Sequence, residues 1–418
     1  QILGPAAETK SLLDLATMEG FQSNNRGLRT LIIGVDISEW FKQAQFPYTL
    51  GPPTLEHTLS ELVSRVVDHL RLPIKMLFVF NGVQCASDRE RQKTEGTALL
   101  AREFQKFLGV LGIPFYTAPA EAESELAQMS AHHLIDAVCT DRSDTFALGA
   151  FNILRKCVLS SVRRVPLISP SWNFKGASFG FYTAQTIRDC PQVALSHGGF
   201  VLVALLAGCP RSVGIVGCGS TLALSLARQG LGDELVDAVQ NLTGHNLSLF
   251  ISAWKVKLIE ELRVDPGGHR PRRYPTLANR VAENRAFPDL SILRYYVSPP
   301  TSWSNAGPGP PPLLFRPIDL GGFSALCETL LPSLYPRSIK VFSKHLYPAA
   351  CMQVLSKVFG FLLLFFNVLI GAGCSEPPSA ARRRGIRRLR RASLSCRYHA
   401  SHRLPTTPAF GLSDRAQH

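Results

Sequence analysis

Continuous apolar runs alternate with amphipathic segments through the first third of the chain. The two longest runs, 31–36 and 76–80, have the composition of strands that are buried on both faces of a parallel sheet. The other elements of this pattern are amphipathic segments and short apolar runs at 58–70, 86–111, 113–116 and 137–140. Strands that alternate with helices in this way predict an α/β fold built on a parallel sheet.

Helical spacing dominates the rest of the chain. We expect one helix over 5–24, before the first strand, and further helices after the sheet over 200–207, 222–262 and 320–355. A loop at 157–180 and a proline-rich linker at 307–312 interrupt this pattern. The chain is therefore divided into five predicted units: 1–156, 157–199, 200–262, 263–355 and 356–418.

A glycine-rich turn precedes the helix that is expected to begin near residue 222. Gly214, Gly217 and Gly219 lie in this turn, and Ser220 follows them at the helix start. Such a turn exposes backbone N–H groups together with the positive end of the helix dipole, which suits a phosphate. A tight turn without a ligand has the same signature, so the turn alone leaves both interpretations open.

Charge and cysteine content narrow the class of protein. Ten arginines and two acids give residues 374–418 a net charge of +8, more than half of the +14 of the whole chain. The body is only mildly basic, as suits a polyanionic partner. The ten cysteines include no Cys-x-x-Cys pair, so we expect neither a zinc module nor a disulfide framework but a reducing interior, nuclear or cytosolic.

Both ends of the chain are unusual. The chain begins at Gln1 without an initiator Met, and we expect a truncated start. The apolar run 358–373 is shorter than the ~20 residues that a spanning helix needs, so we predict no membrane association. The arginine run 382–391 is typical of a nuclear localisation patch, and a solvated tail has the same composition.

Four acids follow predicted strands or begin a predicted helix. Asp36 ends the first buried strand, Glu121 and Glu123 lie at a helix start, and Asp144 follows the strand at 137–140. In an open α/β sheet these positions meet at one crevice. Carboxylates without Cys or His are the ligands of Mg²⁺, and two such ions can drive phosphodiester hydrolysis. The alternative is that each acid caps a helix or faces solvent.

Several segments carry a specific resemblance. They are Ile33-Gly-Val-Asp-Ile-Ser-Glu-Trp40, Phe78-Val-Phe-Asn-Gly82, Ala118-Pro-Ala-Glu-Ala-Glu-Ser-Glu-Leu126, Thr140-Asp-Arg-Ser-Asp-Thr-Phe-Ala-Leu-Gly-Ala150, Leu205-Leu-Ala-Gly208 and Gly214-Ile-Val-Gly-Cys-Gly219. In this order the chain resembles the flap endonuclease/XPG family, and within it the Holliday-junction-resolving branch and its fungal relatives. The resemblance covers roughly residues 3 to 355.

This resemblance implies a fold, a reaction and a set of ligands. The fold would be a PIN-like parallel sheet with flanking helices over 1–156, then a sheet-completing segment, a helix-two-turn-helix element over 200–262 and C-terminal helices. The reaction would be Mg²⁺-dependent cleavage of branched double-stranded DNA such as 5′ flaps or junctions. The implied site residues are Asp36, Glu121, Glu123 and Asp144 for catalysis and metal binding, with Asn81 as a further metal ligand, and Arg89, Arg91, Lys93, Gly214, Ile215, Gly217, Gly219 and Ser220 for DNA. K⁺ would lie at the glycine hairpin.

Three of the seven acidic positions of the family are replaced in this chain. Asn81 stands where the family has Asp after Phe-Val-Phe, Arg142 replaces the first aspartate of an Asp-x-Asp pair, and Pro210 replaces the Asp of Gly-Gly-Asp-Tyr. An amide oxygen can still bind a cation, whereas Arg142 brings a positive charge. Asp141 is expected to point to the other side of the chain from position 142, because side chains alternate in an extended segment.

Three hypotheses follow. The chain is an active nuclease of the family, or a non-catalytic relative that binds branched DNA with one Mg²⁺ or none, or a degenerate gene product. For the first two we expect a nuclear monomer without a small-molecule substrate.

Overall fold

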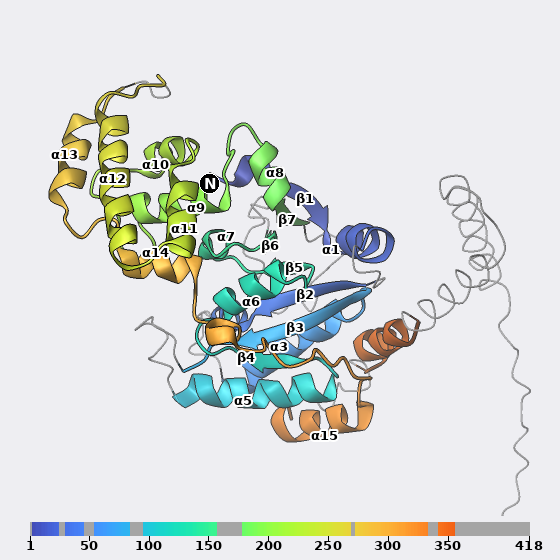
Figure 1. The fold of residues 1–418 in the computed structure, drawn as a ribbon. Coiled ribbons are helices and arrows are strands. Elements are labelled where there is room, and N and C mark those ends of the chain that lie inside the picture. Colours follow the sequence, from blue (N-terminus) through green and yellow to red (C-terminus); the bar gives the residue numbers. More distant parts are fainter. Residues whose placement is uncertain are drawn as a thin grey trace, which may run out of the picture. The chain divides into compact units, whose positions relative to one another are not determined.

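A mixed β-sheet lies at the centre of the α/β part of the chain (Figure 1). The computed structural model describes residues 2–24, 30–45, 54–83, 95–156, 178–268, 272–332 and 342–355. Its strands are β1 (Glu8–Ser11), β2 (Leu31–Asp36), β3 (Ile74–Phe80), β4 (Phe115–Thr117), β5 (Ala137–Cys139), β6 (Asn152–Lys156) and β7 (Ser178–Thr183). They are arranged in the order β1-β7-β6-β5-β2-β3-β4.

The sheet is parallel only in its larger part. Strands β6, β5, β2, β3 and β4 run parallel, as predicted, but β7 pairs antiparallel with β6 and β1 pairs antiparallel with β7. The predicted parallel sheet is thus extended at one edge by two antiparallel strands. The predicted helix over 5–24 was wrong at its start, because Glu8–Ser11 forms β1. This edge strand is polar and partly exposed, so it lacks the apolar run that reveals a buried strand.

Strand β2 is buried along its whole length because it lies in the middle of the sheet. Leu31, Ile33 and Val35 face a core formed with helices α3 (Leu55–His69) and α5 (Glu95–Val110), whereas Ile32 faces helix α6 (Ala122–Ala131). Each such side chain contributes roughly 1.5–3 kcal/mol by burial. At Gly34 a Cβ atom would lie 2.4 Å from a methyl carbon of Leu126, so a side chain there would require the Leu126 side chain to shift.

Helices flank the sheet and continue beyond it (Figure 1). Their bounds are α1 (Leu12–Leu15), the π-helix η2 (Ala16–Gln22), α2 (Ile37–Ala44), α3 (Leu55–His69), α5 (Glu95–Val110), α6 (Ala122–Ala131), α7 (Asp144–Ala147), α8 (Ala184–Asp189), α9 (His197–Ala207), α10 (Ser220–Ala227), α11 (Leu231–Asn241), α12 (Gly244–Arg263), α13 (Pro275–Glu283), α14 (Leu290–Val297) and α15 (Leu320–Leu330). The predicted helix 222–262 is three helices, with a left-handed Gly230 (φ +79°) between the first two. Helices α9 to α14 enclose their own apolar core.

The segment after α14 returns to the sheet rather than linking separate units. Ser302 donates from its backbone N–H to the buried Glu125 at 3.0 Å, and Arg316 donates to the carbonyl of Gly112 at 2.9 Å. Helix α15 then packs on α5, where the rings of Phe323 and Phe107 meet edge to face. The predicted proline-rich linker is thus part of a segment, residues 302–316, whose two ends are hydrogen-bonded to the α/β part of the chain. The tail 356–418, with its apolar and arginine runs, lies outside the described residues.

No helix in the described ranges combines the length and apolarity that a bilayer crossing requires.

Candidate functional site

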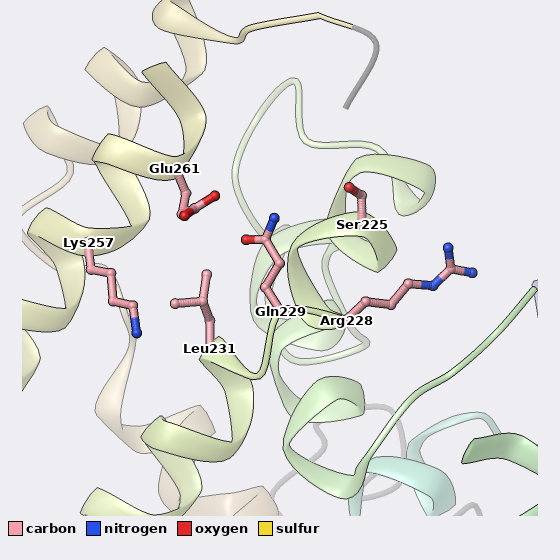
Figure 2. A pocket seen from close by; sticks show the side chains of 6 residues that line it. All are labelled: Ser225, Arg228, Gln229, Leu231, Lys257 and Glu261. Carbon is pink, nitrogen blue, oxygen red and sulfur yellow. The ribbon is translucent and has the colours of Figure 1, made fainter. Parts of the chain in front are cut away.

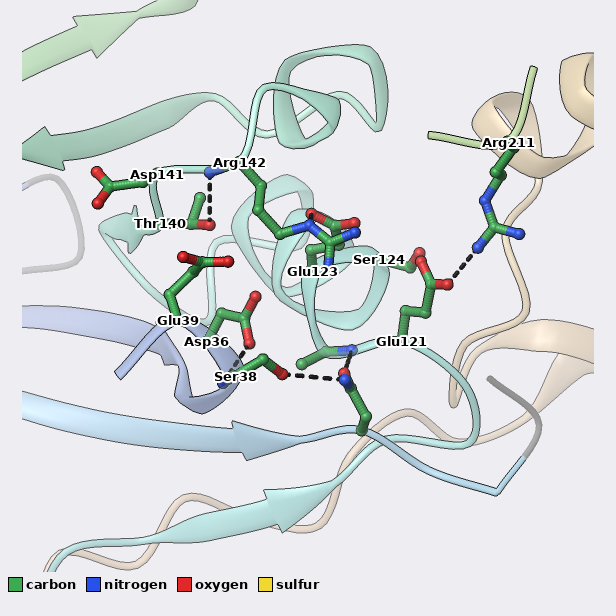
Figure 3. A network of polar contacts seen from close by, with 12 residues as sticks. Asp36, Ser38, Glu39, Glu121, Glu123, Ser124, Thr140, Asp141, Arg142 and Arg211 are labelled. Carbon is green, nitrogen blue, oxygen red and sulfur yellow. Dashed lines mark hydrogen bonds and ion pairs between the residues drawn. The ribbon is translucent and has the colours of Figure 1, made fainter. Parts of the chain in front are cut away.

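The four predicted acids lie beyond the carboxyl ends of the parallel strands, and Figure 3 shows three of them, Asp36, Glu121 and Glu123. Asp36 ends β2 and caps α2, accepting a hydrogen bond from the backbone N–H of Ser38 at 2.9 Å. Glu121 occupies the N-cap position of α6, Glu123 lies in its first turn, and Asp144 begins α7. The parallel part of the sheet therefore places the four carboxylates at one end of its strands.

Burial makes the carboxylates of Asp36, Glu123 and Asp144 costly to ionise. Asp36 and Glu123 are each 1% exposed. Burial raises the pKa of Asp36 and raises the pKa of Glu123 well above its ordinary value, and the Arg142 guanidinium opposes both shifts. Burial also raises the pKa of Asp144, again against the charge of Arg142. A fixed positive charge is therefore already at the centre of the cluster.

Arg142 forms an ion pair with Glu123. Its Nε atom lies 3.0 Å from Oε2 of Glu123, and Figure 3 shows its side chain extending toward that carboxylate. Within the described residues, neither carboxylate oxygen of Glu123 has a hydrogen-bond partner. The charge of Arg142 therefore compensates a carboxylate that is otherwise buried without support.

Arg211 forms the second ion pair, with Glu121. Its guanidinium carbon lies 3.7 Å from the centre of the Tyr295 ring, so the side chain is held between a carboxylate and an aromatic face. Burial raises the pKa of Tyr295, so its hydroxyl stays protonated and donates to Oε2 of Glu121. Both oxygens of Glu121 are thus bonded to residues of the helical region.

Arg211 and Tyr295 were not among the predicted site residues. Arg211 could have been found, because it stands next to Pro210 where the family has a Tyr after its Asp. Tyr295 had no sequence signal, since it lies 174 residues from Glu121 on α14.

Asn81 uses its amide within the protein. Its Oδ1 accepts from the backbone N–H of Ala122 at 2.7 Å, and its Nδ2 donates to Oγ of Ser38 at 3.0 Å. The amide thus ties the end of β3 to the first turns of α6 and α2. Asn81 serves here as a structural connector between three elements.

Pro210 and Asp141 do not provide a further metal ligand at the acidic cluster. Pro210 is exposed in a tight turn that is closed by reciprocal hydrogen bonds between Cys209 and Ser212. The Asp141 carboxylate points away from Arg142, as predicted (Figure 3). Its Oδ2 accepts from Gln43 at 3.4 Å.

This arrangement does not fit two Mg²⁺ ions. Among the residues that the structure describes, no three Asp, Glu, His or Cys side chains are grouped so that they could hold a metal. Glu121 and Glu123 are each paired with an arginine, and the Asn81 oxygen is bonded to a backbone N–H. We therefore derive no catalytic step through metal ions.

The glycine turn has the geometry of an exposed hairpin. Gly214 (φ +68°) and Gly217 (φ +92°) adopt backbone conformations that L side chains rarely adopt. Ile215 anchors the turn, because its backbone N–H donates to the carbonyl of Leu206 at 2.9 Å. Gly219 caps α10 without a side-chain hydrogen bond, and Ser220 is the first helical residue. The predicted DNA contacts Arg89, Arg91 and Lys93 lie outside the described residues.

A surface hollow of about 440 Å³ lies apart from the acids, between α10, α11 and α12 (Figure 2). Arg228 and Lys257 line it together with Ser225, Gln229, Leu231 and Glu261. Arg228 donates to the backbone carbonyls of Val193 and Gln192, and Lys257 pairs with Glu234. The charged side chains of Arg228 and Lys257 are thus already bonded to other residues of the protein.

Comparisons with known proteins agree with the fold and the motifs. The family model of the XPG I-region matches residues 112–210. Flap endonuclease 1 of Encephalitozoon cuniculi is 27% identical over 235 residues, which cover 47% of this chain and 64% of that protein. The chain spans less than two thirds of the length of the curated relatives that it matches.

Solved structures extend the similarity to most of the chain. The junction-resolving enzyme GEN-1 with potassium is 26% identical, with a TM-score of 0.61, over 82% of this chain and 75% of that one. The Holliday junction-resolving enzyme GEN1 in complex with product DNA and Mg²⁺ is 25% identical, with a TM-score of 0.61, over 83% of this chain and 77% of that one.

The sheet, the helices that follow it and the acidic edge define a PIN-like nuclease fold. Residues 112–210 match the XPG I-region, and the chain is similar to flap endonucleases and to the junction-resolving enzyme GEN1.

Proposed function

We propose that this chain binds branched double-stranded DNA and does not cut it by the two-metal mechanism of its family. The observation that carries the proposal is the pairing of Arg142 with Glu123 and of Arg211 with Glu121. Each arginine neutralises a carboxylate that a metal ion would need. Four acids face two arginines, so the cluster retains little of the charge that attracts divalent cations.

Binding is proposed because the parts of the fold that would hold duplex DNA do not share these replacements. The hairpin of Gly214, Gly217 and Gly219 keeps its left-handed turns and its uncapped helix start. Backbone N–H groups at such a helix start bind phosphate without a metal ligand set. Affinity that depends on these contacts falls steeply with salt concentration. We further propose that the protein acts as a monomer in the nucleus.

The test separates binding from cleavage. Purified protein is incubated with a labelled 5′ flap and with a four-way junction, in Ca²⁺ to measure binding and in Mg²⁺ to measure cleavage. We expect salt-sensitive binding without cleavage. A variant that restores the family residues, Asn81→Asp, Arg142→Asp, Pro210→Asp and Arg211→Tyr, is expected to gain Mg²⁺-dependent cleavage.

A second candidate function is cleavage with a single Mg²⁺ ion. It is favoured by Glu123, whose carboxylate oxygens lack hydrogen-bond partners within the described residues and so could accept a cation if Arg142 moved. Cutting by the unaltered chain that disappears in Asp36→Ala would establish this function and end the non-catalytic proposal. Absence of DNA binding in every salt would rule out both.

A further inference from the structure

Arg280 contacts the glycine hairpin from helix α13, which lies outside the predicted helix-two-turn-helix element of residues 200–262. Its Nη1 atom donates a hydrogen bond to the backbone carbonyl of Val216 at 2.8 Å. Val216 is 71% exposed, so this carbonyl lies at the outer side of the turn, where the hairpin would meet DNA. No motif in the sequence had marked Arg280, because it follows the hairpin by 64 residues.

The hairpin is shaped around this guanidinium. A Cβ atom at Gly217 would lie 2.6 Å from Nη1 of Arg280, and the φ of +92° at Gly217 is a second reason why a side chain is disfavoured there. Two other carbonyls of the hairpin form local backbone hydrogen bonds. The carbonyl of Ile215 accepts from the N–H of Cys218 at 2.9 Å, and the carbonyl of Gly219 accepts from the N–H of Ala223, in α10, at 3.0 Å. The Val216 carbonyl instead turns outward and meets a cation.

Helix α13 fixes the position of Arg280. Ala278 and Val281 are fully buried on either side of it in the sequence, and both belong to the core that also contains α9 and α10. The guanidinium is therefore presented from a packed helix rather than from a loop. Because the backbone of α13 is held in the core, the guanidinium moves mainly by rotation about the side-chain bonds of Arg280.

A bound K⁺ and a guanidinium act on a carbonyl by the same charge–dipole attraction. The resemblance to the family implies K⁺ at this hairpin, and GEN-1 has a structure with potassium. In this chain a covalently attached cation is already bonded to the Val216 carbonyl. A second cation beside it would be repelled.

We infer that Arg280 is a positioning residue that replaces the monovalent cation of the hairpin: it holds the turn of residues 214–219 in its phosphate-binding form and supplies the positive charge. The grip on duplex DNA is then independent of which monovalent cation is present. This inference rests on the proposed DNA binding, but it concerns only how the hairpin is held.

The test is to measure the affinity for a plain DNA duplex in KCl, NaCl and tetramethylammonium chloride at one ionic strength, because GEN-1 has structures with potassium, sodium and cesium and a bulky organic cation cannot take the place of these ions. The unaltered chain is expected to bind equally in all three salts. Arg280→Met is expected to bind about three- to tenfold more weakly in tetramethylammonium chloride and to recover part of this loss in KCl. Arg280→Lys keeps a charged donor and is expected to restore the cation-independent binding.

Arg263→Met is the matched control. Arg263 is another exposed arginine of the helical region, but the hydrogen bond that the structure describes for it goes to Asn279 on α13 and not to the hairpin. It is expected to weaken binding equally in the three salts, by loss of charge alone. If Arg280→Met and Arg263→Met behave alike, or if the unaltered chain binds more tightly in KCl, the inference is wrong.

A readout without DNA keeps the inference separate from the proposed function. The backbone N–H of Cys218, which is bonded to Ile215, is expected to exchange with deuterium faster in Arg280→Met than in Arg263→Met. If the chain binds no DNA but exchange is selectively faster, the proposed function fails and the positioning role stands. Equal exchange in the two variants overturns that role, whatever the DNA result.

Discussion

Arg142 Nε lies 3.0 Å from Oε2 of Glu123, so the residue at a position where the resemblance implies an aspartate is ion-paired with a carboxylate that the resemblance implies as a metal ligand. Glu123 is 1% exposed and the side chain of Arg142 is 20% exposed. Removal of the arginine would leave the carboxylate buried without a counter-charge. A single substitution of Arg142 that is made to restore a metal site is therefore expected to lower the stability of the fold.

The first prediction concerns this pair. Arg142→Met is expected to lower the free energy of unfolding at neutral pH by roughly 1–3 kcal/mol, because the buried Glu123 charge loses its compensation. In the Glu123→Gln background the same change is expected to cost less than about 1 kcal/mol. Urea unfolding of the four proteins of this cycle measures the coupling. Costs that simply add would show that the pair does not stabilise the fold.

The pH dependence of the same variant follows from the sign of the shift. Burial raises the pKa of Glu123 above its ordinary value of 4.5, and Arg142 opposes this. In Arg142→Met the folded pKa rises further while the unfolded pKa does not change. A raised folded pKa contributes stability at low pH that is lost as the pH rises through it. The deficit of the variant is therefore expected to grow as the pH rises from the folded pKa of the unaltered chain to the higher folded pKa of the variant, both of which lie above 4.5.

The buried centre of this fold could be predicted from the sequence, and the edge formed by β1 could not. Leu31–Asp36 and Ile74–Phe80 are apolar throughout because both faces of these strands are covered, and such runs leave one interpretation. Glu8–Ser11 is polar and gains its strand conformation only by pairing with β7. Its partner is far along the chain, so no local pattern reports it.

The candidate site divides in the same way. Positions that depend on strand ends, such as Asp36 and Asp144, follow from local pattern and motif. The contacts of Glu121 depend on how the helical region meets the sheet, because Arg211 and Tyr295 come from beyond α9 and from α14. Motif comparison could show that Arg142 was misplaced, but only tertiary packing shows that it meets Glu123.

A second prediction concerns Tyr295. Tyr295→Phe keeps the ring that stacks on Arg211 and removes only the hydroxyl that donates to the buried Glu121. A hydrogen bond to a charged group is worth about 1.5–3 kcal/mol, so we expect a loss of stability of that order. Tyr347→Phe is the control, because Tyr347 is 60% exposed, and it should change little. Equal effects in the two variants would contradict the network around Glu121.

A third prediction concerns the reactivity of cysteines. Burial raises the pKa of the Cys218 thiol to about 11 and of the Cys327 thiol to about 11, whereas Cys351 is exposed. The thiolate reacts and the thiol does not, so at pH 8 alkylation of Cys218 and Cys327 is expected to be roughly 100-fold slower than alkylation of Cys351. Mass spectrometry of the digested protein reads each site separately. Because the folded pKa is raised, ionisation of these thiols opposes folding, and stability is expected to decline above about pH 9.

The last prediction uses two glycines of one hairpin that differ in what surrounds them. At Gly214, with φ +68°, a Cβ atom would lie 2.5 Å from the carbonyl oxygen of Leu206. At Gly219, with a negative φ, it would have nothing within 4 Å. Gly214→Ala is therefore expected to distort the turn, to lower the free energy of unfolding by roughly 1–3 kcal/mol and to weaken duplex binding at least tenfold.

Gly219→Ala is expected to lower the free energy of unfolding by no more than about 1 kcal/mol, because Ala is a poorer helix N-cap than Gly but its methyl group meets no neighbouring atom. Urea unfolding and duplex affinity in one salt measure both variants. If Gly219→Ala abolishes binding while leaving the fold intact, the methyl group blocks a phosphate that approaches the start of α10. If Gly214→Ala is as stable and binds as tightly as the unaltered chain, the left-handed turn is not what holds the hairpin in its phosphate-binding form.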